Sequence, residues 1–184
     1  MIILDNLDKY RRGRVWIDEL PNMSYDVIQQ LHSFIEIKSN SEIQAANLAL
    51  ELSLPRGASN YALVGLRYTP TKNKVVEIKV NVSRNTGEII NDNIASQIDQ
   101  VHVGIPLEYA NVVLNTARSV IQEINDYPSG IIEFNLGAHG LIGSSQVIFS
   151  KITSIIIKLL CKNPSIMSSE AIKNEIFELL NQEK

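Results

Sequence analysis

Three glycines, one histidine and two serines fall within nine residues of the chain, in the segment GAHGLIGSS at positions 137–145. A glycine-rich segment before a helix can bind an anion through backbone N–H groups, and a histidine can act as a general base. Catalysis by His139 also requires a nucleophile and an orienting group within reach. Ser144 or Ser145 is equally suited to begin the helix that follows. The simplest interpretation of His139 is an exposed loop residue, ahead of an RNA- or partner-contacting residue and of a catalytic base.

Positive charge is concentrated in two short segments. The polar turn TPTKNK at 69–74 carries Lys72 and Lys74, and a denser basic run lies near the N-terminus. That run comprises Lys9, Arg11, Arg12 and Arg14. Such charges are most often solvated side chains on a turn or a strand edge, and the alternative is contact with phosphates or with an acidic partner. Both segments are therefore candidate binding sites.

The other reactive side chains show no spacing typical of a catalytic or metal site. No cluster of His, Cys, Asp and Glu has metal-ligand spacing, so we expect no metal. The phosphate-binding pattern Gly-x-x-x-x-Gly-Lys-Ser/Thr is absent, so we expect no GTP binding by this chain, no cofactor and no enzymatic activity. His32 and His102 fall within regular elements and are interpreted as structural or surface residues.

Composition indicates an ordinary globular protein. The chain has 184 residues, of which 45% are apolar and 20% charged, and a formal net charge of −3. The slightly acidic balance argues against extensive duplex nucleic-acid binding. The single cysteine, Cys161, favours a reducing compartment. No stretch is typical of a signal peptide or a membrane span, so we expect a cytoplasmic protein without membrane contact.

The first 57 residues predict a mostly helical N-terminal extension. Ser24 precedes apolar residues that fall on one helical face, and Ser41 and Gln44 have the spacing of a capping box. The first set comprises Val27, Ile28, Leu31, Phe34 and Ile35. The segment Leu-Pro-Arg-Gly at 54–57 ends the second helix. We therefore expect an extension over 1–57 and an α+β domain over 58–184.

From residue 60 the pattern changes to strands and then alternates with helices. Strands are predicted at 60–68 and 75–83 as a hairpin around the turn 69–74, and a short third strand at 96–103. A helix over 104–124, a strand over 130–136 and helices over 146–161 and 171–180 follow, with Ser144 or Ser145 and Ser168 as caps. The order β-β-β-α-β-α predicts an α+β sandwich: a small mixed sheet with helices on one face.

Residues 76–160 resemble the fourth domain of translation elongation factor G and related ribosomal GTPases. The resemblance rests on VEIKVNV at 76–82, on a characteristic helix entry, and on the strand, loop and helix of YPSGIIEFNLGAHGLIGSSQVIFSKITSIIIK at 127–158. The helix entry comprises Gly104, Ile105, Pro106, Glu108 and Tyr109. The resemblance implies the fold of the second domain of ribosomal protein S5, with a left-handed β-α-β crossover.

In that family the first hairpin turn and the loop after the fourth strand form one tip, which enters the ribosomal decoding region. Here the resemblance places Lys72 and Lys74 beside His139, with Gly140 at the position of the family's tip histidine. It implies a non-enzymatic, stand-alone binding domain that contacts the ribosome and its RNA, or a protein partner. The alternatives are a subunit of a larger assembly that docks through the C-terminal helix, and a small-molecule-binding or enzymatic protein of the same fold. The docking residues of that helix would be Ile172, Ile176, Phe177 and Leu180.

Overall fold

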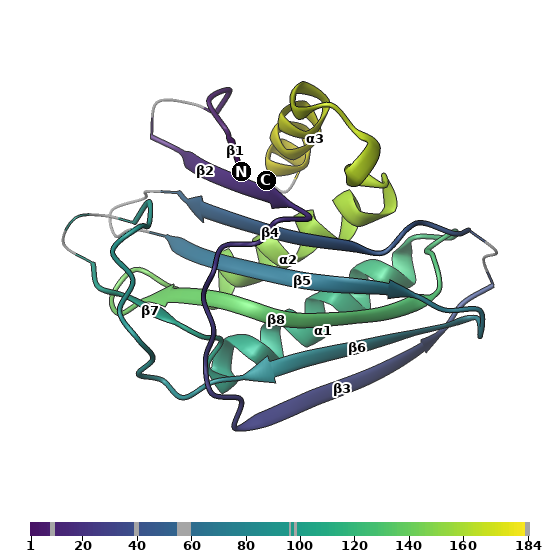
Figure 1. Ribbon diagram of the computed structural model, residues 1–184, viewed down its shortest axis with the longest axis horizontal. Coiled ribbons are helices and arrows are strands. Elements are labelled where there is room, and N and C mark those ends of the chain that lie inside the picture. Colours follow the sequence, from purple (N-terminus) through teal and green to yellow (C-terminus); the bar gives the residue numbers. More distant parts are fainter. Residues whose placement is uncertain (8–9, 39–40, 55–59, 96, 98, 183–184) are drawn as a thin grey trace.

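A computed structural model describes residues 1–7, 10–38, 41–54, 60–95, 97 and 99–182. Within these ranges the chain forms one mixed sheet with α-helices on one side (Figure 1). The strands are β1 (Ile2–Ile3), β2 (Arg12–Ile17), β3 (Gln29–Glu36), β4 (Ala46–Ser53), β5 (Tyr61–Pro70), β6 (Val75–Val82), β7 (Val101–Val103) and β8 (Gly130–Gly140). The helices are α1 (Leu107–Glu123), α2 (Gln146–Cys161) and α3 (Ser169–Gln182), with a short 3-10 helix at Pro164–Ile166. The prediction of an α+β fold is confirmed.

The strands lie in the order β1-β2-β4-β5-β8-β6-β3, and β7 pairs with the end of β8. Every pair is antiparallel except β6 with β8, which are parallel and are connected through α1. A parallel pair requires such a crossover, whereas antiparallel neighbours need only a turn. In Figure 1, α1 and α2 lie behind the sheet, and the chain between β2 and β3 crosses its front.

The predicted helical N-terminal extension is wrong, because the segments expected to be helical contain β3 and β4. Strand β4 is buried on both faces. Its Leu48, Leu50 and Leu52 alternate with Ala49 and Glu51, but Ala, Leu and Glu are strong helix formers, which favoured the helical prediction. In β3 the inward side chains Leu31, Ser33 and Ile35 alternate with exposed ones, but the apolar residues around it also satisfy helical spacing. Strands on both sides of the expected boundary at residue 57 share the sheet, and residues 55–59 lie outside the described ranges.

The predicted hairpin is also wrong, although both of its strands exist. Strand β8 lies between β5 and β6, pairing with β5 from Pro70↔Gly130 to Ala62↔His139. Neighbouring strands are about 4.8 Å apart, so the turn at 71–74 spans roughly twice that distance. Turn residues mark where two strands end. They do not determine whether a later strand inserts between them.

Two apolar clusters stabilise the sheet on its two faces. The larger lies between the sheet and the helices and includes Phe134 and Phe149. The smaller lies on the front face near the start of β5 and includes Trp16, Tyr61 and Leu63. Side chains from the segments 18–28 and 84–95 pack against the smaller cluster, so this end of the sheet is covered on both faces. Among the described helices, none combines the length and the hydropathy of a membrane-spanning segment.

Candidate functional site

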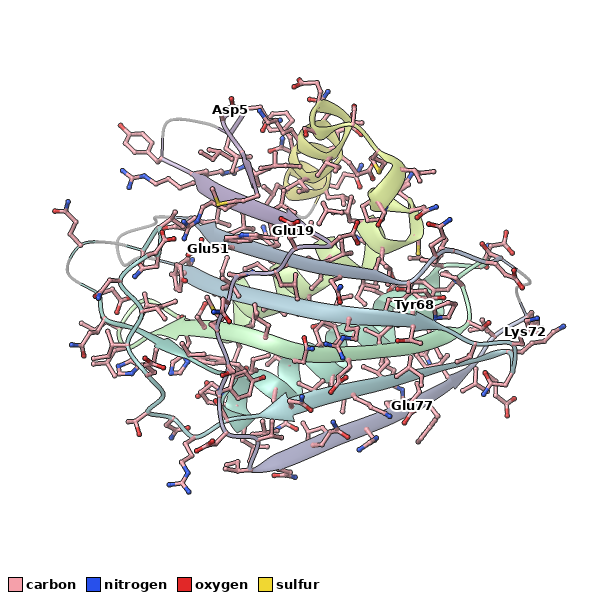
Figure 2. All side chains as sticks on the ribbon, in the orientation of Figure 1. Asp5, Glu19, Glu51, Tyr68, Lys72 and Glu77 are labelled. Atoms are coloured by element: carbon pink, nitrogen blue, oxygen red, sulfur yellow. The ribbon has the colours of Figure 1, made fainter. Side chains whose placement is uncertain are left out.

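The residues expected to form one tip lie at opposite ends of the sheet. Lys72 and Lys74 follow the last residue of β5, whereas His139 pairs with Ala62 near its first residue. Nine residues of β8 separate these positions, which corresponds to about 30 Å of extended strand. Figure 2 shows Lys72 far from Glu51, which lies toward the other end. We name these the lysine end, residues 69–74 with 129–130, and the histidine end, residues 99–104 with 138–147.

His139 is buried in β8, not exposed in a loop as the sequence suggests. Only 6% of its surface is exposed. Its Nδ1 lies 3.3 Å from the Gly104 carbonyl oxygen and its Nε2 lies 3.1 Å from the Asn85 carbonyl oxygen. Burial lowers the pKa of His139, and the two carbonyl groups offset part of that effect. A neutral imidazole donates one hydrogen bond, so only one of the two carbonyls can accept from it at a time.

A second histidine packs against the first. His102 is directly opposite His139 in the β7–β8 ladder, and their rings stack with centroids 5.9 Å apart. The His102 Nδ1 lies 2.9 Å from the Gly87 carbonyl oxygen. Together the histidines hold the backbone of the segment at 85–87 against β7 and β8. Both act on main-chain atoms, which indicates a structural role.

The serines beside His139 are also occupied by structural contacts. Ser144 Oγ accepts from the Gly140 backbone N–H at 2.8 Å and donates to the Tyr61 carbonyl. Ser145 Oγ caps α2 by accepting from the Ile148 N–H at 3.4 Å, as the sequence predicts for one of the two serines. These contacts, together with those of His139, favour the structural interpretation over the catalytic one.

The turn after β8 is fixed by the carboxylate of Asp99. Its Oδ1 accepts from the Ile142 N–H at 3.0 Å and its Oδ2 accepts from the Gly143 N–H at 2.9 Å. The Leu141 N–H donates to the Gln100 carbonyl at 2.9 Å. A Cβ atom on Gly140 would lie 2.1 Å from Asp99 Oδ2, so the close approach of this carboxylate requires glycine there. The backbone of 140–143 is thus held in one conformation.

This fixed turn presents large apolar side chains to solvent. Leu141 is 63% exposed, Ile142 69% and Val147 68%, and Leu107 at the start of α1 is 45% exposed. The Gln146 side chain donates to Glu108 at 3.2 Å, and the Tyr109 hydroxyl donates to the Ser144 carbonyl at 3.3 Å, so the first turns of α1 and α2 lie beside the loop. We name these four residues, Leu107, Leu141, Ile142 and Val147, the apolar apex. Residues 140–147 include no lysine or arginine.

The N-terminal basic run does not form one basic surface. Lys9 lies outside the described residues. Arg12 is exposed at the start of β2, whereas Arg11 donates to the Asn181 side chain of α3 at 3.3 Å. Arg14 turns inward, and only 11% of its side chain is exposed. A shared role of these residues in binding nucleic acid therefore lacks geometric support.

Arg14 belongs to a buried polar network that the sequence did not reveal. Its Nε donates to the fully buried Glu51, its Nη1 donates to Asp92 at 2.7 Å, and the guanidinium lies 5.2 Å from the Trp16 ring centre. Glu51 also accepts from the Tyr61 hydroxyl at 2.8 Å and from the Ile94 N–H at 3.2 Å.

The pKa values in this network follow from its burial and its charges. Burial alone would lower the pKa of Arg14, but the hydrogen bonds and charges of Glu51 and Asp92 outweigh it and raise the pKa. Burial and the Glu51 carboxylate raise the pKa of Tyr61 well above its ordinary value, so its hydroxyl stays a donor. The network joins β2 and β4 to the segment at 92–94. A strand predicted over residues 46–53 would have placed Glu51 within the sheet.

The lysine end is built from fewer and more exposed contacts. Lys72 and Lys74 are both exposed, and Lys74 has a φ of 51°, in the left-handed region. The Thr71 N–H donates to the Ser129 carbonyl at 3.2 Å, which ties the turn to the start of β8. The side chain of Lys72 borders a hollow of about 340 Å³ that Ile43, Pro70 and Ser129 also line.

The C-terminal helix uses its apolar face within the chain. Ile172, Ile176 and Leu180 are buried in the larger cluster, and only Phe177, at 38% exposure, faces solvent. The proposed docking face of α3 is therefore wrong for three of its four residues. Among the side chains that the structure describes, no group of three or more His, Cys, Asp or Glu could hold a metal ion.

A scan against protein-family models, a search of curated proteins and a search of solved structures each found no match to this chain.

Proposed function

We propose that the chain is a non-enzymatic binding domain with the fold of the second domain of ribosomal protein S5, similar to the tip domain of elongation factor G. The order β5-β6-β7-α1-β8-α2 agrees with the β-β-β-α-β-α order that the resemblance implies. In Figure 1, β6 and β8 both point left, β8 lies above β6 and α1 lies behind them, which makes the crossover left-handed. Nearly all such crossovers are right-handed, so this unusual sense supports the resemblance.

The observation that carries the proposal is the apolar apex. Single exposed apolar side chains are common on protein surfaces, but here four of them come from the turn and the two helix starts at one end of the molecule. The Asp99 hydrogen bonds fix the turn that carries Leu141 and Ile142. A surface that is ordered before binding loses less entropy on binding. The apex is therefore suited to bind a cytoplasmic protein that has an apolar pocket.

A second candidate function rests on the lysine end. Lys72 and Lys74 are exposed on one turn, where they can contact phosphates. Binding of ribosomal RNA would then use the end of the sheet opposite to the apolar apex. Because the two ends are separate, one set of variants can tell the two functions apart.

The test compares two double variants, one at each end of the sheet. Leu141→Ser with Ile142→Ser changes the apex, and Lys72→Ala with Lys74→Ala changes the turn. A photo-crosslinking side chain is placed at Val147 in each background, and ribosome co-sedimentation is measured in parallel. We expect one discrete protein crosslink from position 147 that the serine variant loses and the alanine variant keeps. Asp99→Ala should weaken the same crosslink, because it frees the turn without removing an apolar side chain.

Two results would contradict the protein-binding proposal. One is the absence of any crosslink from position 147 in cells that express the chain. The other is ribosome co-sedimentation that the lysine variant loses and the serine variant retains, which favours the RNA function. Thermal unfolding of each variant shows whether a loss of binding reflects a loss of folding.

A further inference from the structure

Strand β3 forms one edge of the sheet, and within the described ranges no further strand pairs with this long edge. It has eight residues, pairs with β6 on one side, and is the last strand in the sheet order (Figure 1). The opposite edge differs, since β1 has two residues and the loop after it contacts α3. There the Asn6 side chain donates to the Lys173 carbonyl at 3.0 Å, and Lys173 pairs with Asp5 at 2.6 Å.

The outward backbone groups of β3 belong to its even-numbered residues. The Ile37 N–H donates to the Lys74 carbonyl at 3.0 Å, one step beyond the pair Glu36↔Val75. Hydrogen-bonded and non-hydrogen-bonded pairs alternate along an antiparallel ladder, so the odd residues of β3 bond to β6. The N–H and C=O groups that point away from β6 are those of Gln30, His32, Phe34 and Glu36. They are positioned to bond a further strand.

This edge has few of the features that usually prevent such pairing. Proteins protect long edge strands with proline, lysine, a bulge in mid-strand or a covering segment. The sequence of β3, QQLHSFIE, contains no proline, lysine or arginine. Phe34 is 65% exposed, and Val27 and Ile28 just before the strand are also exposed. The edge therefore presents both outward-facing backbone groups and apolar side chains.

The strand is complementary to itself in one antiparallel register. We place a two-fold axis perpendicular to the sheet, midway between Ser33 of the two copies. Each residue then lies opposite the residue of the second copy whose number, added to its own, gives 66. The two opposed side chains lie on the same face of the sheet. His32, whose Nδ1 lies 3.6 Å from Glu77 Oε1 of its own chain, is then opposite Phe34 of the second copy, which places two rings side by side. Gln30 is opposite Glu36, and its amide, which donates to Asn81 Oδ1 at 2.6 Å, has a second N–H for that carboxylate. Aromatic pairs and hydrogen-bonded pairs across strands are stabilising, and no like charges are opposed. All four residues are those with outward backbone groups.

We propose that the free edge of β3 pairs antiparallel with β3 of a second copy of this chain, which joins the two sheets into one. This proposal is independent of the apolar apex, because neither β3 nor the segment before it contributes to that surface.

Sedimentation velocity of the full chain over about a hundredfold range of concentration tests the proposal. We expect a reversible dimer for the wild type. Phe34→Lys should sediment as a monomer, because it adds an edge charge and removes the ring. Ile166→Lys is the matched control, since Ile166 is 73% exposed on the 3-10 helix, and it should remain dimeric. A wild type that is monomeric throughout, or a Phe34→Lys variant as dimeric as the wild type, overturns the proposal.

The register can be tested separately with a cysteine at the two-fold axis. Ser33 would face Ser33 of the second copy as a non-hydrogen-bonded pair, with Cα atoms about 4.5 Å apart, within the range that a disulfide spans. Ser33→Cys in a Cys161→Ala background should form a covalent dimer on mild oxidation, whereas Ile166→Cys in that background should not. Equal crosslinking of the two variants would contradict the proposed pairing.

Discussion

The two ends of the sheet use their polar residues in opposite ways. At the histidine end, His139, Ser144 and Asp99 bind backbone groups of neighbouring segments, and the side chains left exposed are apolar. At the lysine end, the charged side chains are exposed, and backbone hydrogen bonds to Ser129 and Ile37 hold the turn. The polar residues of a glycine-rich segment therefore do not predict which of its side chains are exposed to solvent.

The difference follows from how each end is covered. The segment at 84–95 packs over the histidine end, and its backbone groups must find partners once they are shielded from water. His102 and His139 bind two of its carbonyls, and Glu51 binds one of its N–H groups. The turn at the lysine end stays in water, which satisfies its polar groups. Disturbing each end should therefore give effects of different size.

The largest expected effect comes from removing Arg14. Arg14→Ala leaves the Glu51 carboxylate buried without its charged partner, and loss of one partner of a buried pair costs about 3–5 kcal/mol. Arg12→Ala is the matched control, because Arg12 is exposed on the same strand, and its free energy of unfolding should change by less than about 0.5 kcal/mol. Urea denaturation of both variants measures the difference.

The double variant Arg14→Leu with Glu51→Leu isolates the cause. It removes both charges, so it should recover part of the stability that Arg14→Ala loses. Equal losses from Arg12→Ala and Arg14→Ala would show that the buried network contributes no more than a solvated surface charge.

Sequence patterns located α1 and α2 but predicted helices where the structure has β3 and β4. The amphipathic α1 and the serine-capped α2 were predicted close to their observed bounds. Strand β4 consists largely of Ala, Leu and Glu, which favour helices, so its composition alone does not separate strand from helix.

The candidate site was harder to predict because its contacts are not local in sequence. His139 is buried by a segment more than 50 residues earlier, and the carboxylate that fixes residues 142–143 lies more than 40 residues earlier. No pattern within GAHGLIGSS records either partner. The insertion of β8 between β5 and β6, which separates the lysines from the histidine, is likewise a pairing that turn residues do not specify.

The second-largest expected effect is a pH dependence of the free energy of unfolding that arises from the buried His139. Its pKa is lowered in the folded state, so the unfolded chain binds more protons at pH values below the ordinary histidine pKa of about 6.5. The free energy of unfolding should therefore be fully retained above that pH and should fall as the pH falls below it. One group contributes a slope of at most about 1.4 kcal/mol per pH unit.

His139→Gln separates this contribution from those of other titrating groups. Glutamine can still donate to a carbonyl but does not titrate, so its stability profile should be flatter than that of the wild type between about pH 7 and 5. Urea denaturation at several pH values gives both profiles. A wild type that gains stability on acidification relative to the variant would mean that a protonated His139 binds both carbonyls, contrary to the expectation from burial.

The smallest expected effect lies at the lysine end, where the backbone itself is strained. Lys74 has a φ of 51°, a conformation that costs a side-chain-bearing residue about 1–2 kcal/mol and costs glycine almost nothing. Lys74→Gly should therefore gain about 0.5 kcal/mol after the entropy that glycine loses on folding. Lys72→Gly removes the same charge without relieving strain, and its free energy of unfolding should fall by about 0.5 kcal/mol.

Thermal unfolding of the two variants measures these changes in stability. Changes of opposite sign would show that backbone strain is present at this turn, whereas at the histidine end glycine already occupies the crowded position 140. Equal losses would mean that the turn relaxes around Lys74, and the contrast between the two ends would then rest on burial alone.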